Sequence, residues 1–197
     1  MRNIQQLLLL SILSATFAAP AQAQEKQFDG IYIAADIGHR SAHSNLAGDE
    51  DIRIGSALYY GGAVGWRTQS ATNWVWGAEA TFGDIDGFQN QAFAGGLNTA
   101  RVRNVWSANA YIGRVFGPKG RNLISAGGGY ASMRAGFNLM ANELTFSPSD
   151  PGGGYRMFVG YERALFSGIN LRLHGSYANF ANSVETKIAT AGFSYNF

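Results

Sequence analysis

The chain has 197 residues, a formal net charge of +2 and no cysteine, so disulfide bonds cannot stabilise it. Charged residues make up only 14% and aromatic residues 13% of the sequence, which excludes a disordered chain, because disorder requires more charge and fewer rings. The near-neutral charge also argues against nucleic acid as a main partner.

The N-terminus has the three parts of a secretory signal peptide. Arg2 supplies a positive charge, and the apolar run Leu7–Ala19 is too short for a typical membrane-spanning helix. Small residues at Ala21 and Ala23 form a cleavage site. We therefore predict a signal peptide over residues 1–23 and one domain over residues 24–197.

The remaining chain consists of short segments in which apolar and polar side chains alternate, the period of a β-strand. We expect eight strands, over residues 30–38, 55–66, 74–83, 101–116, 123–133, 154–166, 169–180 and 187–197. Long connections (39–54, 84–98 and 134–153) alternate with short ones (67–73, 117–122 and 167–168), before a brief connection at 181–184. This rhythm is typical of a transmembrane barrel, whose long loops all lie at one end. The fold class predicted is all-β, an eight-stranded antiparallel up-and-down transmembrane β-barrel.

The last strand and one hairpin carry a family resemblance. Residues 187–197 end on three ring-bearing residues and resemble the closing strand of bacterial outer-membrane barrels, with its terminal Phe. Residues 154–177 resemble the penultimate hairpin of the porin-like outer-membrane β-barrel family, and Glu-Arg-Ala-Leu at 162–165 lies where that family carries its Glu-aromatic-Ala-Leu step. The segment 76–82 resembles that family's third strand. A looser likeness extends to opacity proteins and to the membrane domain of OmpA.

The resemblance implies a place in the outer membrane of a Gram-negative bacterium. Such families serve as envelope structural proteins, surface antigens, adhesins or small-molecule passages. The implied partners are outer-membrane lipid and lipopolysaccharide, the barrel-assembly machinery through the C-terminal strand, and a host or surface ligand at the loops 39–54, 84–98 and 134–153. We expect a structural or surface-interaction role, with no enzymatic activity, no cofactor and no nucleic-acid partner.

The interior of an eight-stranded barrel is just wide enough for side chains to fill it. The alternation predicts that seven larger side chains point inward: Tyr59, Glu79, Tyr111, Arg156, Glu162, Arg172 and His174. Unpaired buried charges are costly, so we expect Glu79 and Glu162 to face Arg156 and Arg172 and to plug the tube.

Other residues are expected to contact the membrane. An aromatic girdle at the strand ends would comprise Trp66, Trp74, Trp106, Phe116, Phe193, Tyr195 and Phe197. Lys187, Arg101 and Arg103 lie at the loop ends of their strands, where they would either meet lipopolysaccharide phosphates or simply be solvated.

Two alternative functions stay open. The pair His174-x-Ser176, with Glu185 to orient the histidine, is similar to the pattern of outer-membrane lipid A deacylases, although Tyr177 stands where those enzymes carry Asn. The porin-like family instead usually carries Glu and Arg at the positions of His174 and Ser176, so the interior charges are expected to differ from the family's. The other alternative is a narrow small-solute porin.

A metal site is a further possibility in the first long loop. His39 and His43 lie near the acidic run 49–51, and their nitrogen and oxygen atoms suit zinc or calcium. The spacing is not diagnostic, and a solvated acidic loop explains it, so we predict no metal.

Overall fold

The computed structural model describes residues 26–44, 52–86, 89–93, 96–140, 152–180 and 184–197. Within these ranges, residues 43–44, 52–55, 85–86, 89–93, 96–104, 134–140 and 184 are described by their backbone alone. The predicted signal peptide, residues 1–23, lies outside the described residues. The elements in chain order are β1 (Gly30–Ser44), β2 (Ile52–Gln69), β3 (Trp74–Asp86), β4 (Gln89–Phe93), β5 (Gly96–Phe116), the 3-10 turn η1 (Pro118–Gly120), β6 (Asn122–Met140), β7 (Gly152–Phe166), β8 (Ile169–Phe180) and β9 (Val184–Asn196).

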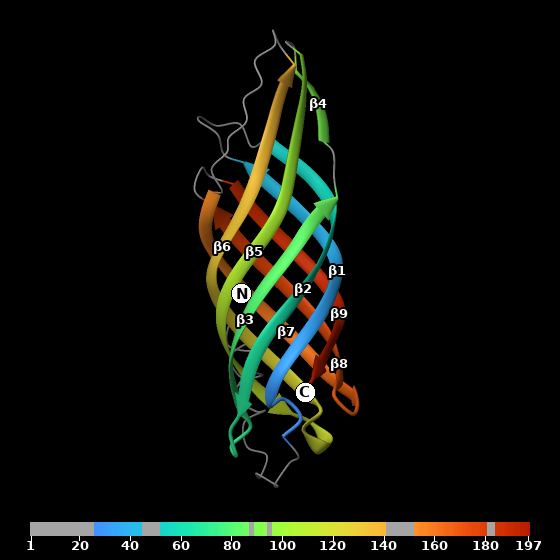
Figure 1. Cartoon of the computed structure of the whole chain (residues 1–197), viewed down its shortest axis with the longest axis vertical. Helices are drawn as coiled ribbons and strands as arrows, with labels where there is room; N and C mark the ends of the chain where they lie inside the picture. Colours follow the sequence, from blue (N-terminus) through green and yellow to red (C-terminus); the bar gives the residue numbers. More distant parts are fainter. Residues whose placement is uncertain (1–25, 45–51, 87–88, 94–95, 141–151, 181–183) are drawn as a thin grey trace, which may run out of the picture.

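Eight of these strands form a closed antiparallel cylinder (Figure 1). Neighbours run in the order β3-β2-β1-β9-β8-β7-β6-β5, and pairing between β3 and β5 closes the circle. The first and last strands pair from Tyr32 with Asn196 to Ser44 with Val184. The predicted fold, an eight-stranded up-and-down β-barrel, is confirmed. Among the described residues, no helix is long and apolar enough to cross a membrane.

The strands are strongly tilted, which brings side chains from distant strands face to face. Tyr32 on β1 pairs with Gly65 on β2, which pairs with Glu79 on β3. Continuing this row of register partners from strand to strand round the barrel ends at Thr186 on β9. Tyr32 itself pairs with Asn196, further along the same strand. Because of this stagger, contacts across the lumen do not follow from the register of neighbouring strands alone.

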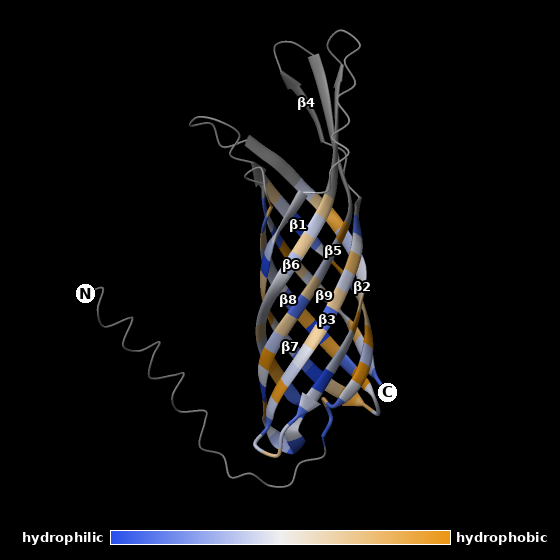
Figure 2. Ribbon diagram, turned by 60° about the vertical axis from the view of Figure 1, so that its left-hand side comes forward, coloured by the Kyte–Doolittle hydropathy of each residue, from blue (hydrophilic) through white to orange (hydrophobic). Residues whose placement is uncertain are grey.

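The two ends of the barrel differ. The turn end carries the connections 70–73, 117–121 and 167–168, together with the C-terminus and the described N-terminal segment (Figure 2). Ser167–Gly168 makes the tightest of these turns, and Gly168 adopts a φ of 74°, which a glycine accommodates without strain. The opposite end, here called the loop end, carries the longer connections.

The predicted boundaries are wrong at the loop end, where strands continue into the expected loops. β1 reaches Ser44 and β2 begins at Ile52, within the expected loop 39–54. In the expected loop 84–98, β4 pairs with β5, and β5 also pairs with β6 as far as Leu97 and Met140. These three strands form a projecting sheet, made of β4, residues 96–103 of β5 and residues 134–140 of β6 (Figure 1). Backbone pairing between antiparallel strands continues there. The apolar face by which the membrane strands were recognised in the sequence does not continue with it.

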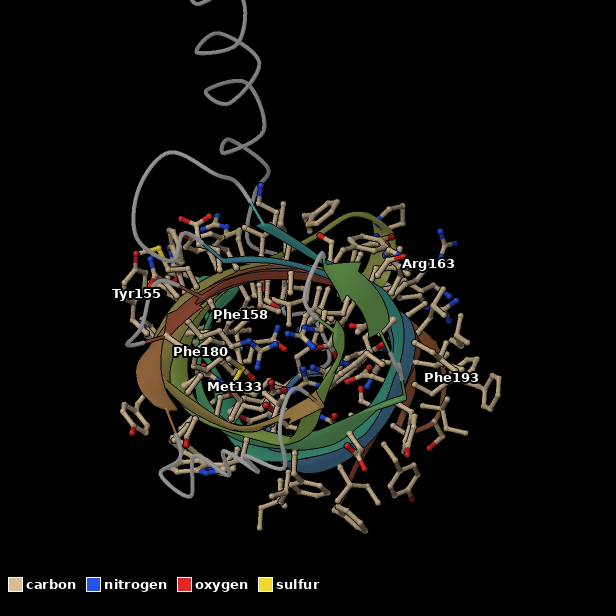
Figure 3. All side chains as sticks on the ribbon, turned by 90° about the horizontal axis from the view of Figure 1, so that it is seen from above. Met133, Tyr155, Phe158, Arg163, Phe180 and Phe193 are labelled. Carbon is tan, nitrogen blue, oxygen red and sulfur yellow. The ribbon has the colours of Figure 1, made fainter. Side chains whose placement is uncertain are left out.

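Alternation along each strand separates an apolar wall from a polar interior. Large apolar side chains are exposed on the outside, for example Ile31 at 56% and Val159 at 63%. Viewed along the barrel, Tyr155, Arg163 and Phe193 point away from the axis, whereas Met133, Phe158 and Phe180 point into the interior (Figure 3). A wall of this kind matches hydrocarbon, which receives the apolar face of a transmembrane barrel.

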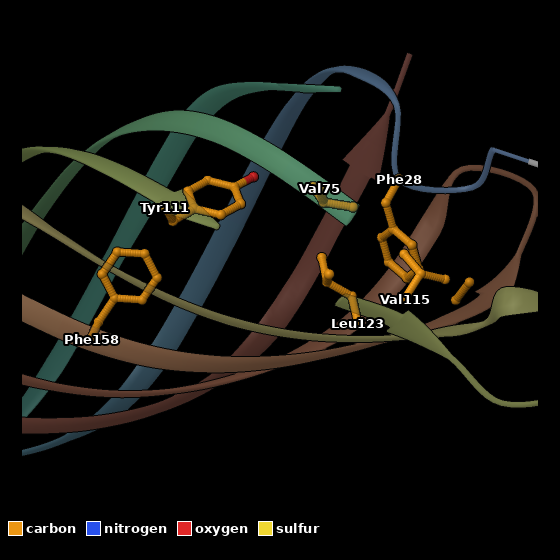
Figure 4. Close-up of a cluster of buried hydrophobic side chains, with 7 residues drawn as sticks. Phe28, Val75, Tyr111, Val115, Leu123 and Phe158 are labelled. Carbon is orange, nitrogen blue, oxygen red and sulfur yellow. The ribbon is translucent and has the colours of Figure 1, made fainter. Parts of the chain in front are cut away.

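Two apolar clusters lie in the lumen. The turn-end cluster consists of Phe28, Val75, Tyr111, Val115, Leu123, Phe158 and Ala164 (Figure 4). Phe28 precedes β1, and its side chain is fully buried among residues from the ends of β3, β5 and β6. The loop-end cluster consists of Tyr59, Ala131, Met133, Ala178 and Phe180. Buried polar and charged side chains share the lumen with these clusters.

Candidate functional site in the lumen

Charged side chains gather in the polar middle of the lumen. Each occupies an inward position of its strand: Asp36 on β1, Arg67 on β2, Glu79 on β3, Arg156 and Glu162 on β7, and Arg172 on β8. Arg67, Glu79, Glu162 and Arg172 are all at most 4% exposed. Charges buried to this degree are stable in a protein only when they are paired.

Arg172 is the centre of the first charge group. Its Nη2 donates a hydrogen bond to Oε2 of Glu79 at 2.9 Å, and its Nε lies 3.4 Å from Oδ1 of Asp36. Nη2 also lies 3.2 and 3.3 Å from the two ring nitrogens of His174. One guanidinium thus joins carboxylates from β1 and β3 to β8.

Arg67 is the centre of the second charge group. Its Nη1 donates to Oε2 of Glu162 at 3.0 Å, and its Nη2 donates to the side-chain oxygen of Asn196. The same Glu162 oxygen accepts a hydrogen bond from Ser194 Oγ at 3.1 Å. The Arg67 guanidinium also lies 5.0 Å from the ring centroid of Phe28, so this pair borders the turn-end cluster.

Tyr32 connects the two groups. Its hydroxyl donates to Oε2 of Glu79 at 2.8 Å, and its ring centroid lies 4.5 Å from the Arg67 guanidinium. The hydroxyl of Tyr111 donates to that of Tyr32 at 3.4 Å. Gly65 on β2 leaves the room that the ring needs, since a Cβ there would lie 2.5 Å from it. The two charge groups are therefore joined through Tyr32 and are not separate ion pairs.

The pairing differs from the arrangement expected from the sequence. Glu79 meets Arg172, but Glu162 meets Arg67. Arg156 instead donates from Nη1 to Thr81 Oγ1 at 3.0 Å and to Ser107 Oγ at 2.8 Å. The physical reason is the strand stagger, which places the Arg156 side chain beside the hydroxyls of β3 and β5.

The members missing from the predicted inward set include Tyr32, Asp36 and Arg67. Asp36 and Tyr32 lie on the inward face of β1, a strand that was correctly recognised. Their alternation with the outward residues of that strand was the signal that could have placed them inside. Arg67 was assigned to a turn because the expected strand ended at residue 66. In the structure β2 continues to Gln69, so Arg67 lies within the strand.

The three residues of the deacylase alternative do not come together. His174 is 9% exposed inside the lumen, where its ring stacks on Phe158 at 5.3 Å and contacts Arg172. Ser176 is the next inward residue of β8. Glu185 pairs in register with Asn179, and alternation places it on the outward face of β9. A carboxylate on the far side of the wall cannot orient this histidine.

The residues predicted as an aromatic girdle lie on the outer wall in two groups. Near the turn end are Trp66, Trp74, Phe116, Phe193, Tyr195 and Phe197. Trp106 lies nearer the loop end, where its ring centroid is 5.6 Å from that of Tyr130. Tyr155 and Tyr177, 6.3 Å apart, extend this loop-end group and were missed. Rings at both ends of an apolar band are typical of transmembrane barrels.

The remaining candidate positions are partly outside the described structure. His39 is exposed on β1, His43 is described by its backbone alone, and the acidic run 49–51 lies outside the described residues. Within the described part of the chain, no cluster of three potential metal ligands occurs. Lys187 is exposed on the outward face of β9, whereas Arg101 and Arg103 are described by their backbone alone.

Several solved structures share this architecture. Ail, the attachment invasion locus protein of Yersinia pestis, is 12% identical with a TM-score of 0.56, covering 86% of this chain and 99% of Ail. Neisserial surface protein A is 17% identical with a TM-score of 0.54, and the match covers 86% and 98% of the two chains. OprG from Pseudomonas aeruginosa is 13% identical with a TM-score of 0.53, covering 88% and 99%. At these identities the likeness establishes the fold.

The sequence itself identifies the family. No curated protein is significantly similar to this chain. The model of the family described as "Outer membrane protein beta-barrel domain" matches residues 9–197, which include every described strand. The chain therefore belongs to the outer-membrane protein β-barrel domain family, and it is an outer-membrane protein.

Proposed function

We propose that this barrel is a closed scaffold that stabilises the envelope and presents its loop end to partners outside the cell. In transmembrane barrels of this type the short turns face the periplasm and the longer connections face outward. The observation that carries the proposal is the lumen, which holds buried ion pairs and two buried apolar clusters.

The side chains that cross the lumen argue against the small-solute porin. The guanidinium groups of Arg67 and Arg172 each bridge to carboxylates or amides on other strands, so the side chains themselves occupy the tube. Moving an ion through this layer would require separating buried pairs in a poorly hydrated space, which costs several kcal/mol. The scaffold role requires no such opening.

The loop end is the surface proposed to contact partners. The connections that join β1 to β2, β3 to β5 and β6 to β7 all emerge there, and the projecting sheet extends the barrel in the same direction (Figure 1). Segments carried on a rigid scaffold are where binding residues concentrate. Ail has been solved with the heparin analogue sucrose octasulfate. That compound is therefore a reasonable first probe for this chain.

Further proposed partners lie in the envelope. The outer wall contacts membrane lipid, with lipopolysaccharide phosphates near Lys187, Arg101 and Arg103. The C-terminal strand, which ends in Phe197, is proposed to engage the barrel-assembly machinery. We propose no enzymatic activity, because the groups of the deacylase alternative lie on opposite faces of the wall.

Bacteria that export the full chain provide the test. One variant replaces residues 87–99 by a short Gly-Ser turn and so removes the tip of the projecting sheet. The matched control replaces residues 70–73 at the turn end. We expect the first variant to lose adhesion to epithelial monolayers or binding of sucrose octasulfate, and the control to keep both. Equal binding and adhesion by both variants, with unchanged envelope integrity when the gene is deleted, would refute the proposed role.

A further inference from the structure

The outer wall contains a shallow groove of about 520 Å³ that the scaffold role does not use. It crosses β1, β9, β8 and β7 towards the loop end. One row of paired residues along it runs from Ser41 through Lys187 to Tyr177. The next row, further from the loop end, runs from His39 through Ala189 to Gly175.

The floor of the groove exists because Gly175 has no side chain. A Cβ at Gly175 would meet only Val159 Cγ2, at 3.9 Å, so the position is open towards the membrane. The other outward glycines of the described strands are different: a Cβ would lie 3.1 Å from a backbone oxygen at Gly62, 2.8 Å from one at Gly128 and 2.1 Å from the Tyr130 hydroxyl at Gly153. Packing of the barrel explains those three but leaves the space at Gly175 unexplained.

The groove also interrupts the apolar wall with polar side chains. Lys187 and His39 are exposed there, and Ser41 lies beside Lys187 in the register. An ionisable residue on a membrane-facing surface calls for a partner. The neighbouring Glu185 contacts the Tyr177 side chain.

The position along the wall indicates where a ligand would lie. Tyr177 borders the groove and belongs to the loop-end aromatic group, which marks the level of the lipid headgroups. Lys187 pairs with Tyr177 and, because paired rows climb from β8 to β9, lies slightly nearer the loop end, while Gly175 and Ala189 are the next outward residues of their strands away from that end and lie deeper in the hydrocarbon. The groove thus has a cationic end at the headgroups and an apolar floor beneath it.

We propose that this groove binds one molecule of lipid A, the phosphorylated glycolipid of the outer leaflet. Lys187 would hold a phosphate, with His39 and Ser41 beside it as hydrogen-bonding groups, and one acyl chain would lie over Gly175 and Ala189. Charge complementarity selects a phosphorylated headgroup, and the position on the outer leaflet selects lipid A over a phospholipid. This inference deepens the proposed contact with lipopolysaccharide and rests on it.

Native mass spectrometry of the folded chain, released from nanodiscs, measures lipid retention directly. The probes are bisphosphorylated hexa-acyl lipid A, its dephosphorylated form and phosphatidylglycerol. Lys187→Gln is expected to weaken retention of bisphosphorylated lipid A about tenfold, the effect of losing one charge-assisted contact. Gly175→Leu, which fills the floor, is expected to weaken retention of both forms of lipid A.

Two control variants match these changes. Arg163→Gln removes an outward cation near the turn end, and Ala110→Leu places the same side chain elsewhere on the wall. Both are expected to retain lipid A like the wild type.

The outcomes distinguish the site from the broader proposal. Failure of the wild type to retain lipid A, or equal retention of phosphatidylglycerol, would refute the contact with lipopolysaccharide and the groove with it. Retention that Lys187→Gln and Gly175→Leu reduce no more than their controls would refute the groove alone.

Discussion

Replacing Glu79 by alanine is expected to lower the free energy of unfolding by about 3–5 kcal/mol, the effect of breaking a buried ion pair from one side. Glu79 is 4% exposed and accepts hydrogen bonds from Arg172 at 2.9 Å and from Tyr32 at 2.8 Å. Without it, Arg172, which is 1% exposed, keeps only the 3.4 Å contact with Asp36 as an ion pair. In a water-filled lumen the same change would cost less than about 1 kcal/mol.

Urea-induced unfolding in lipid vesicles, followed by tryptophan fluorescence, measures this difference. Glu185→Ala is the matched control, because it removes a carboxylate from the outward face. The double variant Glu79→Ala/Arg172→Ala is expected to be less destabilised than the sum of the two single variants, since the residues share one contact. A loss for Glu79→Ala no larger than that for Glu185→Ala would refute the buried network.

Three further predictions concern packing and chemistry. Phe28→Ala is expected to lower the free energy of unfolding in the same assay by about 3–5 kcal/mol, because it empties the centre of the turn-end cluster; an unchanged urea midpoint would contradict that packing. Gly65→Val is expected to lower the free energy of unfolding by about 1–3 kcal/mol, because a Cβ there would lie 2.5 Å from the Tyr32 ring. Gly175→Ala is expected to change it by no more than about 0.5 kcal/mol. Equal effects of the two changes would contradict the close packing inferred at Gly65. His174→Ala is expected to leave the lipid A mass spectrum of cells unchanged, and a shift in acyl-chain number would instead favour the deacylase.

The membrane-embedded part of the fold could be predicted from the sequence, whereas the loop end could not. The alternation in residues 74–83 and 169–180 reflects one face in lipid and one in the lumen, so the strands there were recognised within a few residues. Beyond the membrane, β4 and the extensions of β5 and β6 need backbone pairing but no apolar face. Their sequence therefore indicated loops.

The partners within the lumen were harder to predict than the inward-facing positions. Glu79, Glu162 and Arg172 were all placed inside by alternation, but alternation does not specify which charges meet. The pair between Arg67 and Glu162 joins β2 to β7 across the tube, and it depends on strand tilt and on the length of the arginine side chain. Neither quantity can be read from the spacing of residues within a single strand.

The most direct test of the sealed lumen is the single-channel conductance of the purified chain in a planar bilayer. We expect no stable open level for the wild type, and brief openings only when the network is broken, as in Glu79→Ala/Arg172→Ala. A steady wild-type conductance large enough to pass small sugars would contradict it.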